Sequence, residues 1–158
     1  MIGNTYPFEK EIYKEEEDTL LFVFISVGRR KVRKVIGFTP LDQNLGIYNW
    51  GFGDEDLDPV TKEIFIDDSV ITNNGDTNKV FYTVVSTLRI FLRIHPEATV
   101  RIMGRTKRLT RFYSNVIARK WNEIEAMYEI NGLFGHVKEP FSVDREYDCL
   151  MVVLKSKK

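Results

Sequence analysis

The segment from Ala98 to Glu125 changes its apolar period abruptly, and this change constrains the fold more than any other feature of the chain. Apolar residues first alternate with others, at Ala98, Val100 and Ile102, which is typical of a strand with one apolar face. Beyond Gly104 they recur every three or four positions, which predicts a helix that extends to Glu125. A turn between the two costs least at glycine. The sequence therefore predicts a strand, a tight turn and a helix in direct succession.

The predicted helix has an apolar stripe and a polar face. The apolar stripe consists of Leu109, Phe112, Tyr113, Val116, Ile117, Trp121 and Ile124. The opposite face carries Arg108, Arg111, Asn115, Arg119 and Asn122. Thr106 is the expected N-cap, because a threonine hydroxyl accepts a hydrogen bond from a free backbone N–H of the first turn. We expect the helix to pack by its stripe and to expose the other face.

Positive charge is concentrated around the start of this helix. Seven Lys or Arg residues and one acid, Glu97, lie between Glu97 and Lys120. A helix start normally favours acids, whereas its free N–H groups, reinforced by guanidinium groups, attract phosphate. The pattern predicts a phosphate or nucleic-acid backbone site; a solvated basic face paired with acids elsewhere gives the same pattern. The candidate ligand-binding residues are Arg101, Arg105, Thr106, Lys107, Arg108, Arg111 and Arg119.

Several strands are expected outside this segment. A nearly continuous apolar run at 19–27 predicts a central strand buried on both faces. A hairpin partner is expected at 31–38, with cations on a wet face or at an edge, and Pro40 ends it because proline has no donor for the ladder. Further strands are expected at 46–52, 64–66, 127–134 and 147–154.

A second helix is expected after the turn at 73–76, with Asp76 as its cap. It ends at about Ile94, because the residue before Pro96 is pushed out of the helical region. Its expected buried stripe consists of Val80, Phe81, Val84, Val85, Leu88, Phe91 and Leu92. The order of elements predicts an α+β fold, a mostly antiparallel sheet of five to seven strands with two helices packed on one face.

The length and amino-acid composition are those of an ordinary globular protein. The chain has 158 residues, of which 43% are apolar and 13% aromatic, enough for one domain with a substantial core. We expect a single domain over 1–158, with a lead-in arm at 1–18 and a frayed tail at 155–158. Cations and acids number 23 each, so the formal net charge is zero, which argues against a protein that coats DNA.

The single cysteine, Cys149, excludes an internal disulfide and fits a reducing cytosol. It lies in an apolar strand pattern, so we interpret it as a small core residue rather than a nucleophile. Residues 1–10 lack the apolar stretch of a signal peptide, and the apolar run at 20–27 is too short to cross a bilayer. We therefore expect a soluble, cytoplasmic protein that does not enter membranes.

Candidate chemistry outside the basic segment is sparse. Acids at 54–58 and 67–68 suit Mg²⁺ or Ca²⁺, or form a solvated loop, and Pro59 stands where an EF-hand has glycine. His95 and His136 have no partner at zinc-ligand spacing, and no nucleophile motif is present. We therefore assign no catalytic residue, metal or cofactor, and the sequence favours a non-enzymatic protein over an enzyme.

The aromatic residues Tyr48, Trp50 and Phe52 lie beside glycines, an arrangement in which rings on a sheet can stack bases. They do not match the signature of the RNA-recognition motif. Core packing is the preferred interpretation.

Four segments, 38–41, 48–54, 71–76 and 104–113, carry motifs that are specific as a set. Together they resemble a family of small uncharacterised bacterial proteins defined as a domain of unknown function. The resemblance covers roughly residues 20–154. It implies a free-standing, single-domain cytosolic protein and brings no activity, cofactor or catalytic residue.

Three functions remain open. The first is a non-enzymatic module that binds nucleic acid or a phosphate ligand through the basic strand, turn and helix, by salt-sensitive contacts. The second is a protein-interaction or homo-oligomerising module, in which the basic face meets an acidic patch such as 54–58 of another copy. The third is a metal-dependent hydrolase that uses the acidic loop.

Overall fold

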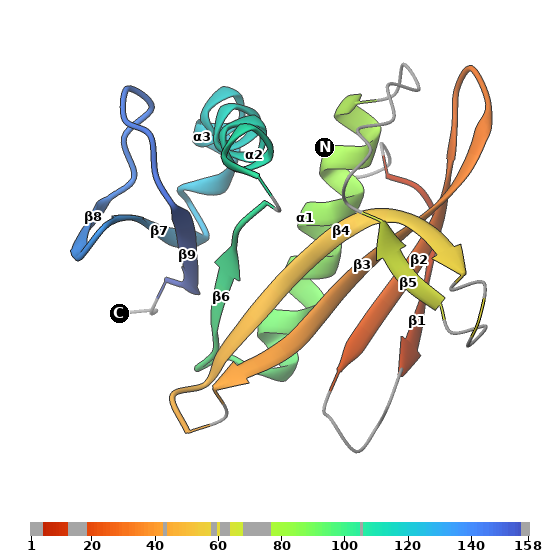
Figure 1. Ribbon diagram of the computed structural model, residues 1–158, viewed down its shortest axis with the longest axis horizontal. Helices are drawn as coiled ribbons and strands as arrows, with labels where there is room; N and C mark the ends of the chain where they lie inside the picture. Colours follow the sequence, from red (N-terminus) through yellow and green to blue (C-terminus); the bar gives the residue numbers. More distant parts are fainter. Residues whose placement is uncertain are drawn as a thin grey trace. The chain divides into compact units, whose positions relative to one another are not determined.

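The computed structural model describes residues 5–12, 19–42, 44–57, 60, 64–67, 77–104 and 106–155. The elements in chain order are β1 (Phe8–Ile12), β2 (Leu20–Val27), β3 (Lys31–Asp42), β4 (Ile47–Leu57), β5 (Ile64–Asp67), α1 (Thr77–Ile94), β6 (Thr99–Ile102), α2 (Lys107–Arg119), α3 (Trp121–Ile124), β7 (Tyr128–Phe134), β8 (Val137–Pro140) and β9 (Cys149–Leu154) (Figure 1). Strands β4 and β6 pair in parallel, and the other pairs with a described register are antiparallel. This confirms the α+β class and the mostly antiparallel sheet.

The chain divides into two compact units, which we describe separately. Unit 1 is built from Met1–Thr39 and Gly51–Phe91, and unit 2 from Pro40–Trp50 and Leu92–Lys158. Strands β3 and β4 and helix α1 contribute residues to both units.

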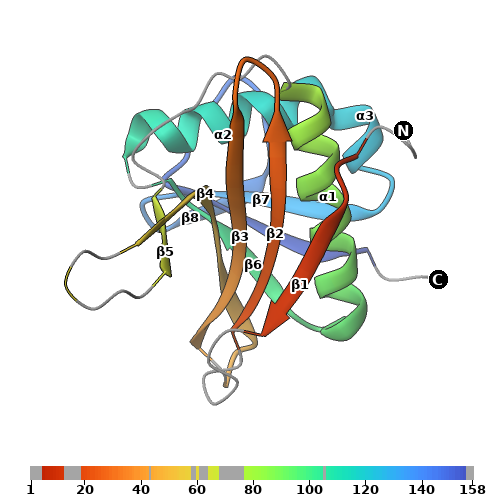
Figure 2. The same cartoon turned by 90° about the vertical axis from the view of Figure 1, so that its right-hand side faces the viewer.

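Unit 1 is organised around β2, which pairs with β1 and β3 on its two sides (Figure 2). Phe22 and Phe24 are buried on one face of β2, and Leu21 and Val23 are buried on the other. A strand buried on both faces needs an almost continuous apolar run, because successive side chains point to opposite faces. The predicted strand at 19–27, buried on both faces, is therefore confirmed as far as Phe24. Burial on both faces ends at Ile25, which is 49% exposed.

Helix α1 packs by a different stripe from the predicted one. Leu88, Phe91 and Leu92 are buried as expected. The prediction for the first half of the helix was wrong, because the fully buried side chains in that half include Thr83 and Thr87. The four predicted residues of that half, Val80, Phe81, Val84 and Val85, are only half-buried.

Buried threonine is possible in α1 because its hydroxyl finds partners inside the protein. Thr83 Oγ1 donates to the Lys79 carbonyl at 2.8 Å, and Thr87 Oγ1 donates to the Val84 carbonyl at 2.7 Å. Thr83 Oγ1 also accepts from the Tyr6 backbone N–H at 2.8 Å, which ties the segment before β1 to the helix. A pattern search that scores threonine as polar misses this stripe.

Several predicted boundaries were wrong. Strand β3 continues through Pro40 to Asp42, because a proline is tolerated where its missing N–H is not needed by a neighbouring strand. Strand β4 includes 54–57, predicted as an acidic loop, since these residues pair with β5 in a register that sets Asp54 opposite Asp67. Residues 137–140, where no strand was predicted, form β8 against β7.

The basic helix is shorter than predicted. It breaks at Lys120, whose φ of −111° and ψ of 20° are not helical and whose N–H bonds to the Ile117 carbonyl. Trp121 and Ile124 keep the apolar period across the break and lie on α3, so the sequence pattern alone does not show the interruption. The predicted turn at 73–76, the cap Asp76 and the acidic residues at 15–18 lie outside the described residues.

Unit 2 contains β6 between the first residues of β4 and strand β9, with β7 and β8 following on the far side of β9. Val100, Leu150 and Val152 are fully buried on one face of this sheet. Helix α2 packs there, with the ring of Tyr113 edge-on to Trp50 at 5.0 Å between centroids. Tyr48 and Trp50 are buried, which confirms that they belong to the core.

The core of unit 1 provides the first prediction. Phe91 is fully buried and stacks on Phe38 with 4.3 Å between ring centroids. Replacing Phe91 with alanine removes the ring and leaves a cavity, so the free energy of unfolding should fall by about 3–5 kcal/mol. Ile94→Ala on the same helix, at a side chain 49% exposed, should cost less than about 1 kcal/mol. Urea unfolding measures both, and equal losses would contradict the assigned packing of α1.

Candidate functional site

The turn before α2 depends on the absence of a side chain at Gly104. A Cβ at this position would lie 2.6 Å from the Leu109 Cβ and 2.6 Å from the Thr110 backbone nitrogen. The Gly104 N–H donates to Thr110 Oγ1 at 2.9 Å, and Thr110 Oγ1 donates to the Thr106 carbonyl at 3.2 Å. The first turn of α2 therefore folds directly against the end of the strand.

The predicted N-cap is confirmed. Thr106 has extended backbone angles, φ −126° and ψ 160°, and its Oγ1 accepts a hydrogen bond from the Leu109 N–H at 3.1 Å. This bond satisfies one of the free donors of the first turn. Thr106 therefore positions α2 through its side chain instead of offering that oxygen to a ligand.

The two faces of α2 are arranged as predicted. Leu109 and Ile117 are buried, and no acidic residue occurs in the helix. The residues of the predicted polar face are all exposed. They are Arg108, Arg111, Asn115 and Arg119 on α2, and Asn122 on α3. With Lys107, α2 presents four exposed cations, two of them in its first two residues.

One of the seven candidate residues, Arg101, does not join this face. Arg101 lies on β6, half-buried, and donates from Nε and Nη2 to Asn49 Oδ1 at 3.3 and 3.0 Å. Its partner stands directly opposite on β4. Arg105 lies outside the described residues. The structure thus brings together Thr106, Lys107, Arg108, Arg111 and Arg119 on α2 and its cap.

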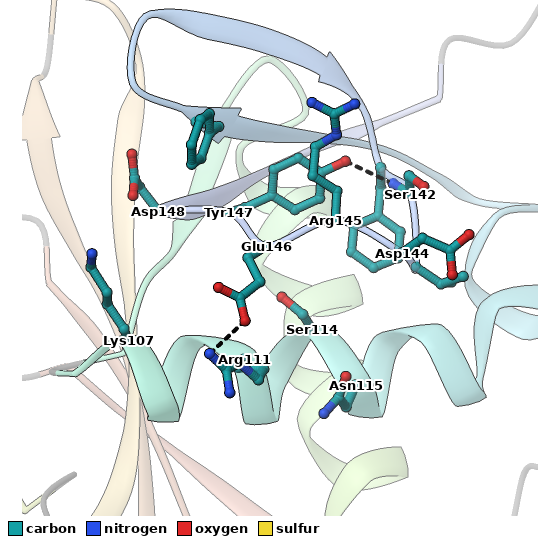
Figure 3. Close-up of a pocket in the computed structure, with 13 residues that line it drawn as sticks. Lys107, Arg111, Ser114, Asn115, Ser142, Asp144, Arg145, Glu146, Tyr147 and Asp148 are labelled. Carbon is teal, nitrogen blue, oxygen red and sulfur yellow. Dashed lines mark hydrogen bonds and ion pairs between the residues drawn. The ribbon is translucent and has the colours of Figure 1, made fainter.

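An open groove of about 240 Å³ runs along α2 within unit 2 (Figure 3). One wall is formed by Lys107, Arg111, Ser114 and Asn115 of the helix. The other is the segment 141–148, with Phe134 from the end of β7. Sequence analysis missed this second wall, because no motif marks it and only strand pairing brings it opposite the helix.

Acids of the second wall balance the cations of the groove. Arg111 Nη2 lies 2.5 Å from Glu146 Oε1, and Figure 3 shows the two side chains pointing toward each other across the groove. Their side chains are 57% and 71% exposed, so solvent screens the pair and its contribution to stability is small. Asp148 Oδ2 accepts from the Gly135 N–H at 2.9 Å, and Arg145 Nε lies 2.8 Å from Glu139 Oε1.

The segment 141–148 is held in place by Tyr147. Its ring lies where a Cβ on Gly132 would stand only 2.3 Å away, so a glycine is required beneath it. The Tyr147 hydroxyl accepts from the Ser142 N–H at 2.9 Å and lies 3.4 Å from the Pro140 carbonyl, to which it donates. Burial raises the pKa of Tyr147 above its ordinary value, so this hydroxyl, which is protonated at neutral pH in any tyrosine, remains a donor to higher pH.

The single cysteine and the two histidines of the chain lie in three different surroundings. Cys149 is 8% exposed, and the pKa of its thiol is raised by burial, with Asp148 adding to the rise and Arg101 opposing it. His95 packs against Tyr48 at 5.2 Å, whereas His136 lies exposed at the β7–β8 turn. No group of three or more potential metal ligands occurs among the described residues. None of the described helices is long and apolar enough to cross a membrane.

The close approach at Gly104 predicts a specific sensitivity. Gly104→Ala forces a Cβ against backbone and side-chain atoms of α2, so the free energy of unfolding should fall by about 1–3 kcal/mol. Met103→Ala, one residue earlier at a side chain 41% exposed, should change it by less than about 0.5 kcal/mol. Thermal or urea unfolding distinguishes them; a Gly104→Ala variant as stable as the wild type would show that the turn has room.

The raised pKa of Cys149 gives stability a pH dependence. The folded protein keeps this thiol protonated above the value of about 9.0 typical of a free thiol, so unfolding releases a proton at alkaline pH. The contribution of the protonated thiol to the free energy of unfolding is fully present below pH 9. It is lost as the pH rises through the pKa of Cys149 in the folded protein. Urea unfolding at pH 7 and pH 10 should therefore show a larger loss for the wild type than for Cys149→Ala. Identical losses would mean that the thiol is not shielded.

Comparison with known proteins shows the family of the chain. No curated protein and no solved structure matches it. A family model described as "Family of unknown function (DUF6934)" matches residues 4–155, nearly the whole chain. This confirms the resemblance, found in the sequence, to a family defined as a domain of unknown function. The chain belongs to the family of unknown function DUF6934.

Proposed function

We propose that the protein binds a phosphate-bearing polyanion, such as the backbone of a nucleic acid, through the solvent face of α2, and that it does so without catalysing a reaction. One observation carries this proposal. Lys107, Arg108, Arg111 and Arg119 are all exposed on a helix of 13 residues that contains no acid. Exposed guanidinium and ammonium groups bind phosphate oxygens through charge-assisted hydrogen bonds.

The spacing of these cations suits an extended anion better than a single ion. At about 100° and 1.5 Å per residue, the four positions fall within an arc of roughly 120° and span about 18 Å along the helix axis. A nucleic-acid strand presents one charge per about 3.4 Å of its axis, so several phosphates face this length. Such contacts do not depend on base sequence and weaken as salt rises.

Glu146 limits how strongly the face attracts anions. Its carboxylate lies 2.5 Å from Arg111 Nη2 and occupies that guanidinium group when no ligand is bound. An exposed ion pair of this kind contributes about 0.2–1 kcal/mol, so a phosphate can displace it at small cost. Glu146 is therefore a competitor for the site, and its removal should strengthen anion binding.

A protein partner is the second candidate. The exposed apolar side chains Phe134, Val137 and Val143 lie on β7, on β8 and in the segment 141–148, at 55%, 55% and 60% exposure. Exposed apolar side chains beside a groove that carries both charges are typical of interaction surfaces. An acidic patch at 54–58 of another copy remains the hypothesis for that partner.

The test is fluorescence anisotropy with labelled oligonucleotides over a range of salt concentrations. A variant with Arg108, Arg111 and Arg119 changed to alanine should bind more weakly, and its log–log salt slope should fall by about one for each phosphate that the variant no longer neutralises. Glu146→Gln should bind about 1.5- to 5-fold more tightly than the wild type, as expected from removing an exposed ion pair.

The matched control changes three exposed cations of the β2–β3 turn, Arg29, Arg30 and Lys31, to alanine. It alters the net charge equally and leaves α2 intact, so binding should be nearly unchanged. Absence of salt-dependent binding at low salt would overturn the proposal. So would an equal loss in the control variant, because binding would then follow net charge alone.

A further inference from the structure

Phe134 is an unusual feature of the groove beside α2. Its side chain is 55% exposed, although it follows the half-buried Leu133 at the end of a well-paired strand. It lines the same groove as Lys107 and Arg111. Anion binding by α2 makes no use of an aromatic ring, so the ring of Phe134 is available for a different kind of contact with the same ligand.

The backbone around Phe134 is held firmly. Phe134 stands opposite Val137 in the β7–β8 pair, and the next residue, Gly135, turns the chain with φ +60°. The Gly135 N–H donates to Asp148 Oδ2 at 2.9 Å, and the Asp148 N–H donates to the Leu133 carbonyl at 2.7 Å. A ring mounted on such a rigid element loses little conformational freedom when a flat ligand stacks on it.

We infer that the groove binds single-stranded nucleic acid, with phosphates on Lys107 and Arg111 and an unpaired base stacked on Phe134. This inference rests on the proposed function of α2 and names its ligand. Cations that follow a backbone, beside an aromatic ring that receives a base, are the combination by which proteins hold single strands. Bases within a duplex are stacked on one another, so a double helix offers no free face to this ring.

The acids of the groove determine which side of the bound strand faces each wall. Asp144 and Glu146 lie on the segment 141–148, opposite the cations of α2 (Figure 3). Their carboxylates repel phosphates from that wall, so the backbone follows the helix and the bases point toward the segment. There a carboxylate can accept hydrogen bonds from base amino groups, as acidic side chains do from cytosine N4.

The experiment compares three probes on the full chain: a labelled single strand, the duplex of the same sequence, and inorganic polyphosphate. The test variant is Phe134→Ala, and Leu45→Ala is its control, since Leu45 is an exposed apolar residue of unit 2 that does not line the groove. Both side chains are exposed, and urea unfolding verifies that both variants remain folded. Phe134→Ala should weaken single-strand binding by about 5- to 150-fold, the loss expected for one stacked base.

The remaining expectations separate stacking from charge. Phe134→Ala should bind polyphosphate as the wild type does, and Leu45→Ala should bind all three probes as the wild type does. A variant with both Lys107→Ala and Arg111→Ala should lose affinity for all of them. The wild type should prefer the single strand to the duplex.

Two results would overturn the inference and leave the proposed function standing. One is unchanged single-strand affinity in Phe134→Ala while the variant without Lys107 and Arg111 binds more weakly. The other is a wild type that binds the duplex at least as tightly as the single strand. Failure of the wild type to bind any of the three probes at low salt would overturn the proposed function together with this inference.

Discussion

The backbone of Gly104 lies so close to Leu109 and Thr110 that no Cβ fits between them, and the arrangement of unit 2 around α2 depends on this contact. Since the N–H of Gly104 bonds to the Thr110 hydroxyl, the helix begins at a fixed rotation relative to β6. That rotation buries Leu109 and Ile117 and turns the cations of the helix to solvent. One missing side chain therefore determines which face of α2 a ligand meets.

The charge of that face is compensated from a distant part of the chain. Arg111 meets Glu146, which lies in the segment before the last strand. The protein has equal numbers of cations and acids, and the positions of its ion pairs decide whether a basic face stays open. Here the pair is exposed and weak, so the groove is neutral at rest and still accessible to a stronger anion.

The thiol of Cys149 and the side chain of Tyr147 are buried in unit 2 and contribute to its packing. Cys149 lies in β9 beneath neighbouring side chains, and the resulting loss of solvation keeps its thiol protonated. Tyr147 uses its hydroxyl to hold the Ser142 backbone and its ring to cover Gly132. The groups left for binding are the exposed ones, namely the cations of α2, the acids opposite and the ring of Phe134.

The sequence by itself determined the elements that local periodicity encodes, because apolar spacing depends on neighbours within one or two turns. The strand at 19–27, the N-cap Thr106 and the exposed face of α2 are examples. It failed at the buried Thr83 of α1, where a distant contact decides, since the Thr83 hydroxyl bonds to the Tyr6 backbone. It also missed the break at Lys120, because the apolar period continues across it. Only the tertiary structure set Phe134 and Glu146 opposite α2, since the pairing of β7 with β9 brings them there and no local pattern records it.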